Sequence, residues 1–322
     1  MERFLKIFSF LFSFILIAFI GYICLKMFVW DDFYQEREKR SDFLSNFYED
    51  DTDAPLSEEN QPVGENLQNT IYNRPFSLLL MGIDTNNVNV GRSDTMILAI
   101  VNPETKDISL LNIPRDMRTP IYGRSGSEKI THAHAYGLET AINTTEDFFQ
   151  IPIDFYATIN FNGFRDLIDT IGGLELDVER RIAFQDRITH QYFTLEPGPQ
   201  HLDGMESLNY ARYRYGPDGD YGRMRRQVQV LQAFADQTAD IRNIPKLNKI
   251  IDVLGNNVKT DIDLTQLIKI MLNMHDINGE NISTIPMEST PQMINGVSYV
   301  IVSDTEKSNI QNTLKNLLKE RY

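Results

Sequence analysis

Hydrophobic residues are distributed along the 322-residue chain in two different ways. A run of 19 uncharged residues, Ile7–Leu25, lies near the N-terminus, whereas shorter apolar runs separated by turn residues begin only at Phe76. A helix as long as the first run rises about 28 Å, close to the hydrocarbon thickness of about 30 Å. The first run therefore predicts a transmembrane helix, and the later runs predict a folded domain.

Charged residues beside the first run predict its orientation. Arg3 and Lys6 precede it and Asp31 and Asp32 follow it, and positive charge favours the cytoplasmic side. A cleaved signal peptide is the alternative, but no small-x-small cleavage site follows the run, so a retained anchor is favoured. We expect residues 1–30 to form a cytoplasmic tip and a membrane anchor, with the rest of the chain outside the cell.

Residues 31–73 are acidic, polar and poorly periodic. Between Asp31 and Glu65 there are 12 acidic and 3 basic residues, so this stretch carries most of the net charge of −14. A segment of this composition cannot bury enough apolar surface to fold alone, and it predicts an extracytoplasmic linker. The acidity also argues against nucleic acid as a partner. The single cysteine, Cys24, excludes a disulfide within the chain.

Residues 74–322 alternate between strand-like and helical patterns. Short apolar runs predict strands at Phe76–Met81, Thr95–Val101, Ile108–Ile113, Phe155–Asn160, Leu174–Val178, Ile282–Ile285 and Tyr299–Val302. Helical spacing predicts helices at Thr140–Phe149, Phe164–Ile171, Ser207–Tyr213, Tyr221–Ile241, Leu264–Met274 and Ile310–Leu318. Interleaved strands and helices of this kind predict a layered α/β domain.

Two acidic residues lie at the ends of predicted strands. Asp84 follows the first strand and Asp94 precedes the second. Ligands of α/β sheets usually bind at strand ends, and two carboxylates there suit a hard cation such as Mg²⁺. The alternative is that each Asp caps a turn, which is the commonest role of Asp in a loop.

Arginines provide a second signal. Arg115 follows the third strand, and residues 210–227 contain five arginines against two aspartates in an acidic protein. Arg223, Arg225 and Arg226 lie in the first turns of a predicted helix, where the helix dipole disfavours cations. An anion among them, such as a phosphate, would explain the arrangement. The alternative is that acidic side chains of the protein pair with them.

A third candidate is His132-Ala133-His134, whose spacing could ligate zinc. No third His, Cys or carboxylate follows at a recognisable interval, which makes this interpretation weak. The chain also has no Walker A motif, no dinucleotide fingerprint and no HExxH.

Several blocks, taken in order, resemble the LytR–CpsA–Psr family of bacterial cell-envelope proteins. They are LLLMGIDT (78–85), GRSDTMILAIVNP (91–103), IPRD (113–116), KITHAHAYG (129–137), DLIDTIGGLELDV (166–178), and HLDGMESLNYARYR with DGDYGRMRRQ (201–227). The resemblance covers about residues 76–233, and it follows one predicted transmembrane helix. It implies that residues 74–322 form the family's catalytic domain.

The resemblance implies an α/β/α fold with a central mixed sheet and an apolar groove for a polyprenyl chain. It implies a Mg²⁺- or Mn²⁺-dependent phosphotransferase that moves a polyprenyl-diphosphate-linked anionic or sugar polymer to peptidoglycan. A polyprenyl-diphosphate hydrolase and a non-catalytic envelope regulator are the alternatives. The expected partners are the lipid-linked polymer, peptidoglycan and the membrane.

The family's site residues transfer to this chain by position. Asp84 and Asp94 match the metal-binding acids. Asp220, Arg115 and Arg223 match the catalytic residues. The diphosphate-binding residues correspond to Arg92, Arg115, Arg212, Arg214, Arg223, Arg226 and Gln227. The chain departs from the family at three points: the loop after Asp84 lacks a common Arg, Leu138 replaces a Gly, and the Arg214–Asp220 loop is about one residue short.

Overall fold

A computed structural model describes residues 74–85, 91–185, 192–238, 253, 257–262, 266, 270, 274 and 277–319. These residues all belong to one compact unit, Asn60–Tyr322. The predicted anchor (1–30) and the predicted linker (31–73) both lie outside the described residues. Within the part that is described, no helix has the length and apolar character needed to cross a membrane.

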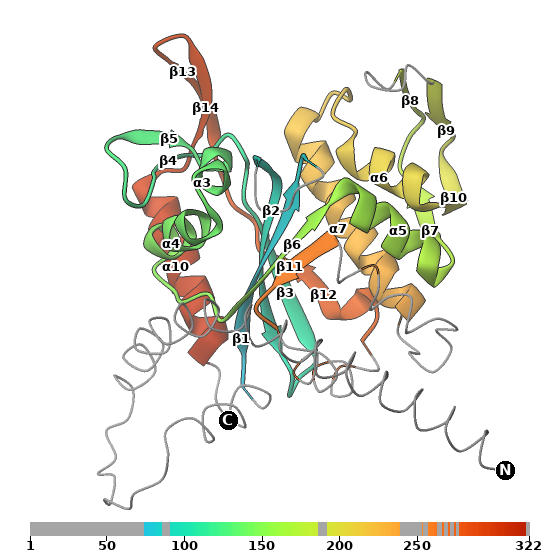
Figure 1. Ribbon diagram of the computed structural model, residues 1–322, viewed down its shortest axis with the longest axis horizontal. Coiled ribbons are helices and arrows are strands. Elements are labelled where there is room, and N and C mark those ends of the chain that lie inside the picture. The colour runs from blue at the N-terminus through green and yellow to red at the C-terminus, as the bar shows by residue number, and fades with distance from the viewer. Residues whose placement is uncertain are drawn as a thin grey trace, which may run out of the picture. The chain divides into compact units, whose positions relative to one another are not determined.

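The centre of the unit is a six-stranded mixed sheet (Figure 1). Its strands, in spatial order, are β11 (Val258–Thr260), β6 (Phe155–Asn160), β1 (Phe76–Ile83), β2 (Ser93–Asn102), β3 (Asp107–Asn112) and β12 (Ile282–Thr284). Strand β1 pairs in parallel with β6 and antiparallel with β2, and β3 pairs antiparallel with β2 and in parallel with β12. The mixed α/β fold predicted from the sequence is confirmed.

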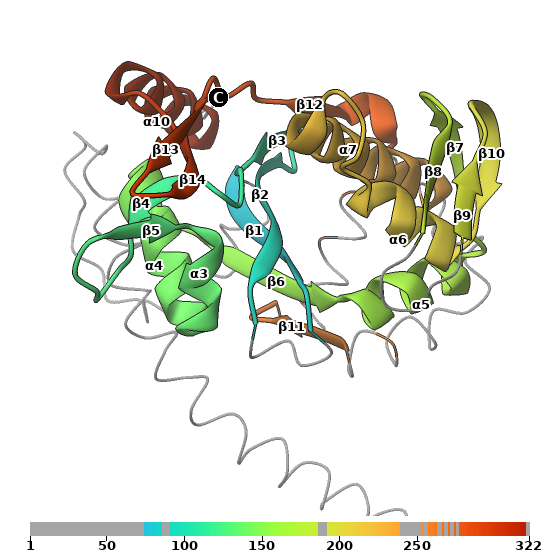
Figure 2. The ribbon, with the colours of Figure 1, turned by 90° about the horizontal axis from the view of Figure 1, so that it is seen from above.

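Helices cover both faces of the sheet, as the view from above shows (Figure 2). Helices α3 (Thr131–Ala135), α4 (Leu138–Phe149) and α10 (Asp304–Lys319) lie on one face. Helices α5 (Phe161–Ile171), α6 (Gly204–Arg212) and α7 (Gly219–Thr238) lie on the other. A strand sends alternate side chains to opposite faces of its sheet. Because helices cover both faces of β1 and β2, the side chains on both faces are apolar, and each strand is a continuous apolar run in the sequence.

Two separate hydrophobic clusters lie on the α7 side of the sheet. One joins Phe76 and Phe155 of the sheet, whose rings meet edge to face at 5.5 Å, with Val228 of α7. The other joins α5, α6 and α7 with the ladder of β7 (Leu174–Val178) and β10 (Gly198–Leu202), and it includes the fully buried Tyr210. Helix α7 therefore contributes to both clusters.

Capping residues fix both ends of α5 and the start of α6. The side chain of Asn160 accepts a hydrogen bond from Gly163 N at the start of α5, and Gly172, at φ 97°, ends that helix in the left-handed conformation. A capping box of Asp203 and Glu206 starts α6. The residue types that form these three caps are visible in the sequence.

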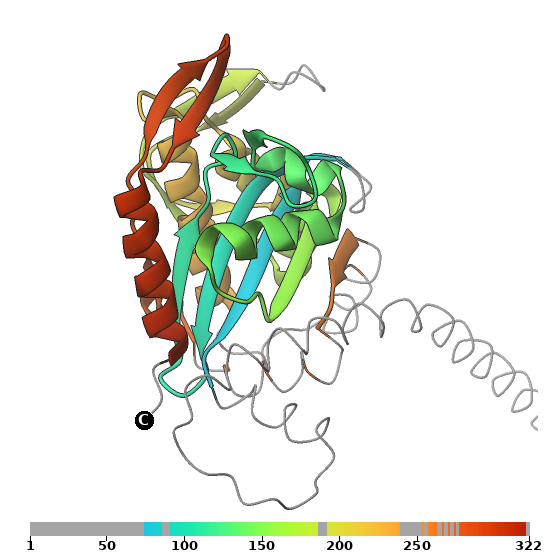
Figure 3. The same ribbon diagram turned by 90° about the vertical axis from the view of Figure 1, so that its left-hand side faces the viewer.

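Four two-stranded antiparallel sheets complete the described part of the unit. They are β4 (Arg118–Pro120) with β5 (Ser127–Lys129), β7 with β10, β8 (Ile182–Gln185) with β9 (Tyr192–Leu195), and β13 (Thr290–Ile294) with β14 (Val297–Ile301). Figure 3 shows α10 along the side of the sheet, with β13–β14 extending beyond it. A short 3₁₀ helix, η3 (Gly279–Asn281), precedes β12.

The sequence predicted the major elements and missed the minor ones. Each of the seven predicted strands has a counterpart, and α4, α5, α6, α7 and α10 confirm five predicted helices. Helix α7 starts at Gly219, two residues before the predicted start at Tyr221. Most of the predicted helix Leu264–Met274 lies outside the described residues. Helix α3, the 3₁₀ helix η3 and strands β4, β5, β8, β9, β10, β11 and β13 were not predicted.

Candidate active site

The predicted site residues gather at one edge of the central sheet. Strands β1, β3 and β6 run in the same direction, so their C-terminal ends share that edge. Asp84 follows β1, Arg115 follows β3, and Asp94 lies at the start of β2 on the same edge. The first turns of α7 also approach this edge, because Gln227 Nε2 donates to Thr95 Oγ1 at 2.8 Å.

A β-bulge places Asp94. Gly82 is opposite Thr95 and Ile83 is opposite Ser93, so Asp94 is the extra residue of β2. A bulge interrupts the strict alternation of side chains and re-aims the extra residue. The Asp94 side chain is therefore directed by the irregular pairing of β1 and β2, which sequence periodicity does not report.

Asp84 is held by the backbone of the following loop. Its Oδ1 accepts a hydrogen bond from Arg92 N at 3.1 Å, and its own N–H donates to Arg92 O at 3.3 Å. Gly91, at φ 122°, makes this approach possible, because a Cβ there would lie 2.9 Å from Asp84 Oδ1. Asp84 and Arg92 are both exposed, so this pair presents one carboxylate and one guanidinium to solvent.

Two ion pairs form the centre of the site. Arg115 Nη1 donates to Asp94 Oδ1 at 2.7 Å, and Arg223 Nη2 lies 2.7 Å from Asp220 Oδ1. Burial by itself lowers the pKa of Arg115, but the bond to Asp94 and the charges of Asp94, Asp116 and Asp220 outweigh it and raise that pKa. Burial lowers the pKa of Arg223, although Asp220 opposes this shift. The four charges thus act on one another across β2, the end of β3 and α7.

The two arginines retain hydrogen-bonding capacity. The Nε atoms of Arg115 and Arg223 are buried and have no hydrogen-bond partner among the described residues. The side chain of Arg223 is only 7% exposed, whereas that of its partner Asp220 is 31% exposed. Buried guanidinium donors that lack a partner are costly unless an anion or water meets them. The arrangement can therefore accept an anion beside the two ion pairs.

The remaining predicted diphosphate-binding residues have different surroundings. The guanidinium of Arg212 lies over the ring of Phe161, 4.3 Å from its centre, at the start of α5. Arg214 is exposed, and its charge is close enough to Arg223 to lower the pKa of that residue. Gln227 is largely buried and links α7 to β2 through Thr95. The loop after α6 therefore brings Arg214 toward the central pairs.

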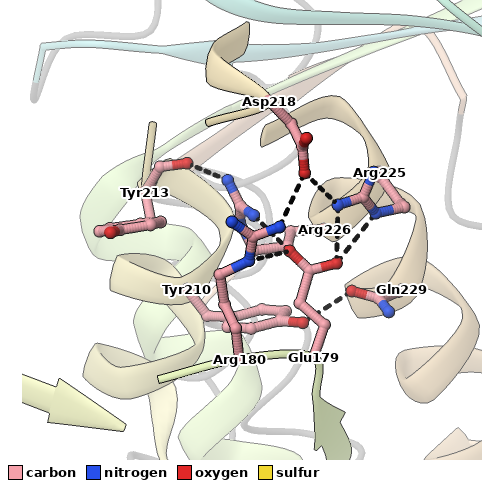
Figure 4. Close-up of polar contacts among 8 residues, drawn as sticks. All are labelled: Glu179, Arg180, Tyr210, Tyr213, Asp218, Arg225, Arg226 and Gln229. Carbon is pink, nitrogen blue, oxygen red and sulfur yellow. Dashed lines mark hydrogen bonds and ion pairs between the residues drawn. The ribbon is translucent and has the colours of Figure 1, made fainter. Parts of the chain in front are cut away.

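Arg225 and Arg226 are not the free cations that the helix-dipole argument predicted. Glu179, directly after β7, accepts from Arg226 Nη1 through Oε1 at 2.7 Å and from Arg225 Nε through Oε2 at 2.9 Å (Figure 4). Asp218 Oδ2 accepts from Arg225 Nη2 at 2.9 Å and also from Arg180. The anion predicted for this part of α7 is supplied by the protein's own carboxylates. Arg226 thus occupies a buried ion pair, separate from the Asp94–Arg115 pair.

Glu179 and Asp218 are the important residues that the sequence did not reveal. Glu179 lies in Val178-Glu179-Arg180-Arg181, directly after a predicted strand, and its acidic side chain beside two arginines was the only signal available. Its partners in α7 follow 46 and 47 positions later. A separation of this size cannot be inferred from local spacing.

His132 and His134 do not share a site. His132 Nδ1 lies 3.0 Å from Glu128 Oε2 on the surface, whereas His134 is buried and its Nδ1 lies 3.0 Å from Gly91 O. A carbonyl oxygen can only accept, so the Nδ1 of His134 is the protonated nitrogen and donates. The zinc interpretation of this pair therefore fails.

Asp84 and Asp94, the two predicted metal-binding carboxylates, both lie at this edge of the sheet. Across the described ranges, no group of three His, Cys, Asp or Glu side chains is placed to hold a metal ion. Each of the two carboxylates uses Oδ1 for the hydrogen bond described above. Mg²⁺ is commonly held by one or two carboxylates, with substrate phosphates and water completing its shell. Two carboxylates at this edge of the sheet would suit Mg²⁺ only together with phosphate oxygens and water.

Sequence and structure comparisons identify relatives. The profile of the LytR_cpsA_psr family matches residues 44–316. A protein of Halalkalibacterium halodurans named polyisoprenyl-teichoic acid–peptidoglycan teichoic acid transferase TagU is 38% identical over 249 residues, 76% of this chain and 80% of that protein.

Two solved structures have the same fold. Bacillus subtilis TagV superposes with a TM-score of 0.67 at 33% identity, over 78% of this chain and 99% of that one. A structure of TagT bound to LIIa-WTA superposes with a TM-score of 0.63 at 27% identity, over 82% of this chain and 94% of that one. With the family profile matched over most of its length, the chain belongs to the LytR–CpsA–Psr family.

Proposed function

We propose that this protein is a phosphotransferase that moves a polyprenyl-diphosphate-linked teichoic acid, or a related anionic glycopolymer, to a hydroxyl group of peptidoglycan. The observation that carries the proposal is the pairing of Asp94 with Arg115 and of Asp220 with Arg223 at one sheet edge. The transferase name of the TagU relative supports the same reaction class. The polymer class is taken from that name.

Arginines of the site bind the diphosphate in this proposal. The Nε donors of Arg115 and Arg223 face the bound anion, and the exposed Arg92 and Arg214 approach from the loops. Charge-assisted hydrogen bonds from guanidinium groups suit phosphate oxygens. Arg212 contributes from its position over Phe161. Arg226 and Gln227 support the site without contacting the diphosphate, because their polar groups are hydrogen-bonded to Glu179 and Thr95.

Asp220 is the proposed general base. It accepts the proton of the peptidoglycan hydroxyl as that oxygen attacks the phosphorus bonded to the polymer. The bond from this phosphorus to the bridging oxygen breaks, polyprenyl phosphate leaves, and a phosphodiester remains between polymer and peptidoglycan. Arg115 and Arg223 stabilise the negative charge that spreads over the phosphoryl oxygens during transfer.

Asp84 and Asp94 are the residues that would hold a divalent ion, Mg²⁺ or Mn²⁺. When bound, the ion would neutralise part of the charge on the diphosphate oxygens. The Asp94–Arg115 hydrogen bond would then orient both the metal ligand and the phosphate-binding guanidinium. Replacing either carboxylate by an amide should reduce activity and its dependence on the divalent ion.

The polyprenyl chain is proposed to lie between the two hydrophobic clusters of the α7 face. Partly buried apolar side chains that pack against the two clusters would contact it, among them Leu80 of β1, Phe164 of α5, and Leu231 and Phe234 of α7. The hydrophobic run Ile7–Leu25 would anchor the protein in the membrane that contains this substrate. The domain would act on the outer side of that membrane.

The test uses the full-length protein in detergent micelles. A synthetic polyprenyl-diphosphate-linked glycan and a peptidoglycan oligomer serve as substrates, and mass spectrometry detects the phosphodiester product. We expect transfer with Mg²⁺, and losses of at least about 100-fold for Asp220→Asn and Arg115→Ala. Glu196→Gln, which removes an exposed ion pair with Arg181, is the matched control and should remain active.

Two outcomes would overturn the proposal. Release of the glycan phosphate in the presence of acceptor, with no phosphodiester product, would make the protein a hydrolase. Full transfer by Asp220→Asn and Arg115→Ala would place the chemistry elsewhere in the chain.

A further inference from the structure

Glu179 is the centre of an ion-pair network outside the catalytic pairs. Its side chain is 18% exposed, and it lies 2.7 Å from Arg226 Nη1, 2.8 Å from Arg225 Nη2 and 3.8 Å from Arg180 Nε. Asp218 closes the network through Arg180 and Arg225, both at 2.9 Å (Figure 4). The network joins the end of β7, the loop between α6 and α7, and the first turns of α7.

Arg226 is the buried part of this network. Its side chain is only 2% exposed, and its guanidinium lies over the ring of Tyr213 at 5.2 Å. Its Nη2 donates to the backbone carbonyl of Tyr213. Arg226 therefore connects Glu179 to the first residue after α6, and its small exposed fraction leaves it mainly in contact with the protein itself.

The loop from Tyr213 to Asp218 carries a residue of the proposed site. Arg214 follows Tyr213 directly, is exposed, and acts electrostatically on Arg223. The loop is fixed at its start by Arg226 and at its end by the ion pairs of Asp218. A hydrogen bond from Gly219 N to Gly216 O spans its second half. The position of Arg214 thus depends on two points of attachment, and Glu179 contacts the arginines at both.

We propose that Glu179 is a positioning residue, which places Arg214 against the diphosphate through Arg226 and the Tyr213 carbonyl. This inference rests on the proposed phosphotransferase function. Glu179 supplies the negative charge that keeps the Arg226 guanidinium buried, and that guanidinium holds the loop backbone one residue before Arg214. Without this carboxylate the buried guanidinium has no counter-charge and moves toward water.

A double-mutant cycle tests the connection. The variants are Glu179→Gln, Arg214→Ala and the two combined, and the rates are measured at varied concentrations of the lipid-linked donor. Glu179→Gln and Arg214→Ala should each raise KM for the donor by about tenfold, the equivalent of one charge-assisted hydrogen bond. Neither should change kcat by more than about twofold, since loss of binding common to ground and transition states leaves kcat unchanged.

The combined variant distinguishes positioning from a merely structural role. If Glu179 acts through Arg214, adding Glu179→Gln to Arg214→Ala should raise KM by less than about twofold further. Glu196→Gln, in the exposed pair with Arg181 at 3.0 Å, is the control and should match the unmodified protein. Multiplying effects in the combined variant, or an unchanged KM in Glu179→Gln, would overturn the proposal.

Two further measurements keep the test decisive. If Glu179→Gln does not fold, the double variant Glu179→Gln, Arg226→Met is used instead, because removing both charges of a buried ion pair is often tolerated. The same rise in KM is expected for this double variant. Hydrogen exchange of the amides of residues 213–219 should accelerate in Glu179→Gln and not in Glu196→Gln. If the unmodified protein shows no transfer, the proposed function fails, and hydrogen exchange alone decides whether Glu179 holds the loop.

Discussion

His134 is a buried imidazole that holds a backbone carbonyl beside the site. Burial is the main cause of its lowered pKa, although the hydrogen bond to Gly91 O opposes the shift. The unfolded chain takes up a proton as pH falls below 6.5, whereas the folded protein resists protonation at His134. The unfolded state therefore binds more protons. The free energy of unfolding should fall as pH drops from 7.5 toward 5.5, a range of about one pH unit on each side of the ordinary histidine pKa of 6.5.

Replacing His134 by Gln tests this account, since the Gln amide can still donate to Gly91 O. The free energy of unfolding, measured with denaturant at pH 7.5 and 5.5, should fall less with pH in His134→Gln than in the unmodified protein. His132→Gln, which alters a surface imidazole paired with Glu128, is the control. Parallel pH dependences for His134→Gln and the unmodified protein would contradict the prediction.

Arg223 and Arg226, both expected from the sequence to await an anion, should respond differently to truncation. Arg226→Ala removes the buried partner of Glu179 and should reduce the free energy of unfolding by about 3–5 kcal/mol. Arg223→Ala leaves Asp220 without its partner, but the Asp220 side chain is 31% exposed and can be hydrated. The free energy of unfolding of Arg223→Ala should therefore fall by less than about 2 kcal/mol. Denaturant unfolding of both variants checks the difference, and equal losses would refute it.

At the residue scale, residues that belong to recognisable motifs could be named from the sequence, whereas their contact partners could not. Asp94, Arg115, Asp220 and Arg223 could be named because each belongs to a motif, and the structure brings them together. The dipole argument favoured a phosphate among the arginines of α7, whereas Glu179 and Asp218 pair with Arg225 and Arg226. It could not decide between a substrate phosphate and Glu179, because nothing local connects a strand end with a helix 47 positions later.

The close crossing of helices α5 and α6 depends on one glycine. A Cβ on Gly204 would lie 2.2 Å from the carbonyl oxygen of Arg165, which is backbone and cannot turn aside. Gly204→Ala should therefore destabilise the domain by about 1–3 kcal/mol, as overpacking does. Met205→Ala, at the exposed neighbouring position, is the control for helix effects. Thermal unfolding is the measurement, and equal melting temperatures for the two variants would contradict this packing.

At the element scale, the length of an apolar run decided what could be predicted. The inner strands β1 and β2 of the central sheet are largely buried on both faces, and their continuous hydrophobic runs made them visible in the sequence. The three-residue strands β4 and β5 and the largely exposed strand β13 contain few buried residues and leave no such pattern. Helix α3, with five residues, is shorter than two helical turns and shows no recognisable spacing.

The predicted topology of the whole chain can be tested without a structure of the anchor. An enzyme reporter that is active only outside the cytoplasm, fused after Tyr322, should be active in intact cells, because the charges around Ile7–Leu25 favour a cytoplasmic N-terminus. The same fusion lacking residues 1–30 is the control and should be inactive. The prediction is wrong if a reporter restricted to the cytoplasm is active at the same fusion point.

At the scale of the domain, the layered α/β class followed from the alternation of elements, but the strand order did not. Strand β1 pairs in parallel with β6, although β2 and β3 lie between them in the sequence. Pairings between distant strands depend on helices packing across the sheet, and hydrophobic periodicity does not record them.

The two edge strands of the sheet have a consequence for how the chain folds. Strand β12 pairs with β3, where the hydroxyls of Ser109 and Ser283 meet across 174 positions, and β11 pairs with β6 across about a hundred. The sequence blocks that carry the proposed chemistry end at Gln227. The outer backbone groups of β3 and β6 nevertheless lack strand partners until β12 and β11 have been synthesised. Contacts this distant slow folding, and unpaired edges invite association with other chains. Translation must therefore continue well beyond the last motif before the sheet that carries those motifs can be completed. A nascent chain that stops at Gln227 would expose the unpaired backbone of two strands, β3 and β6.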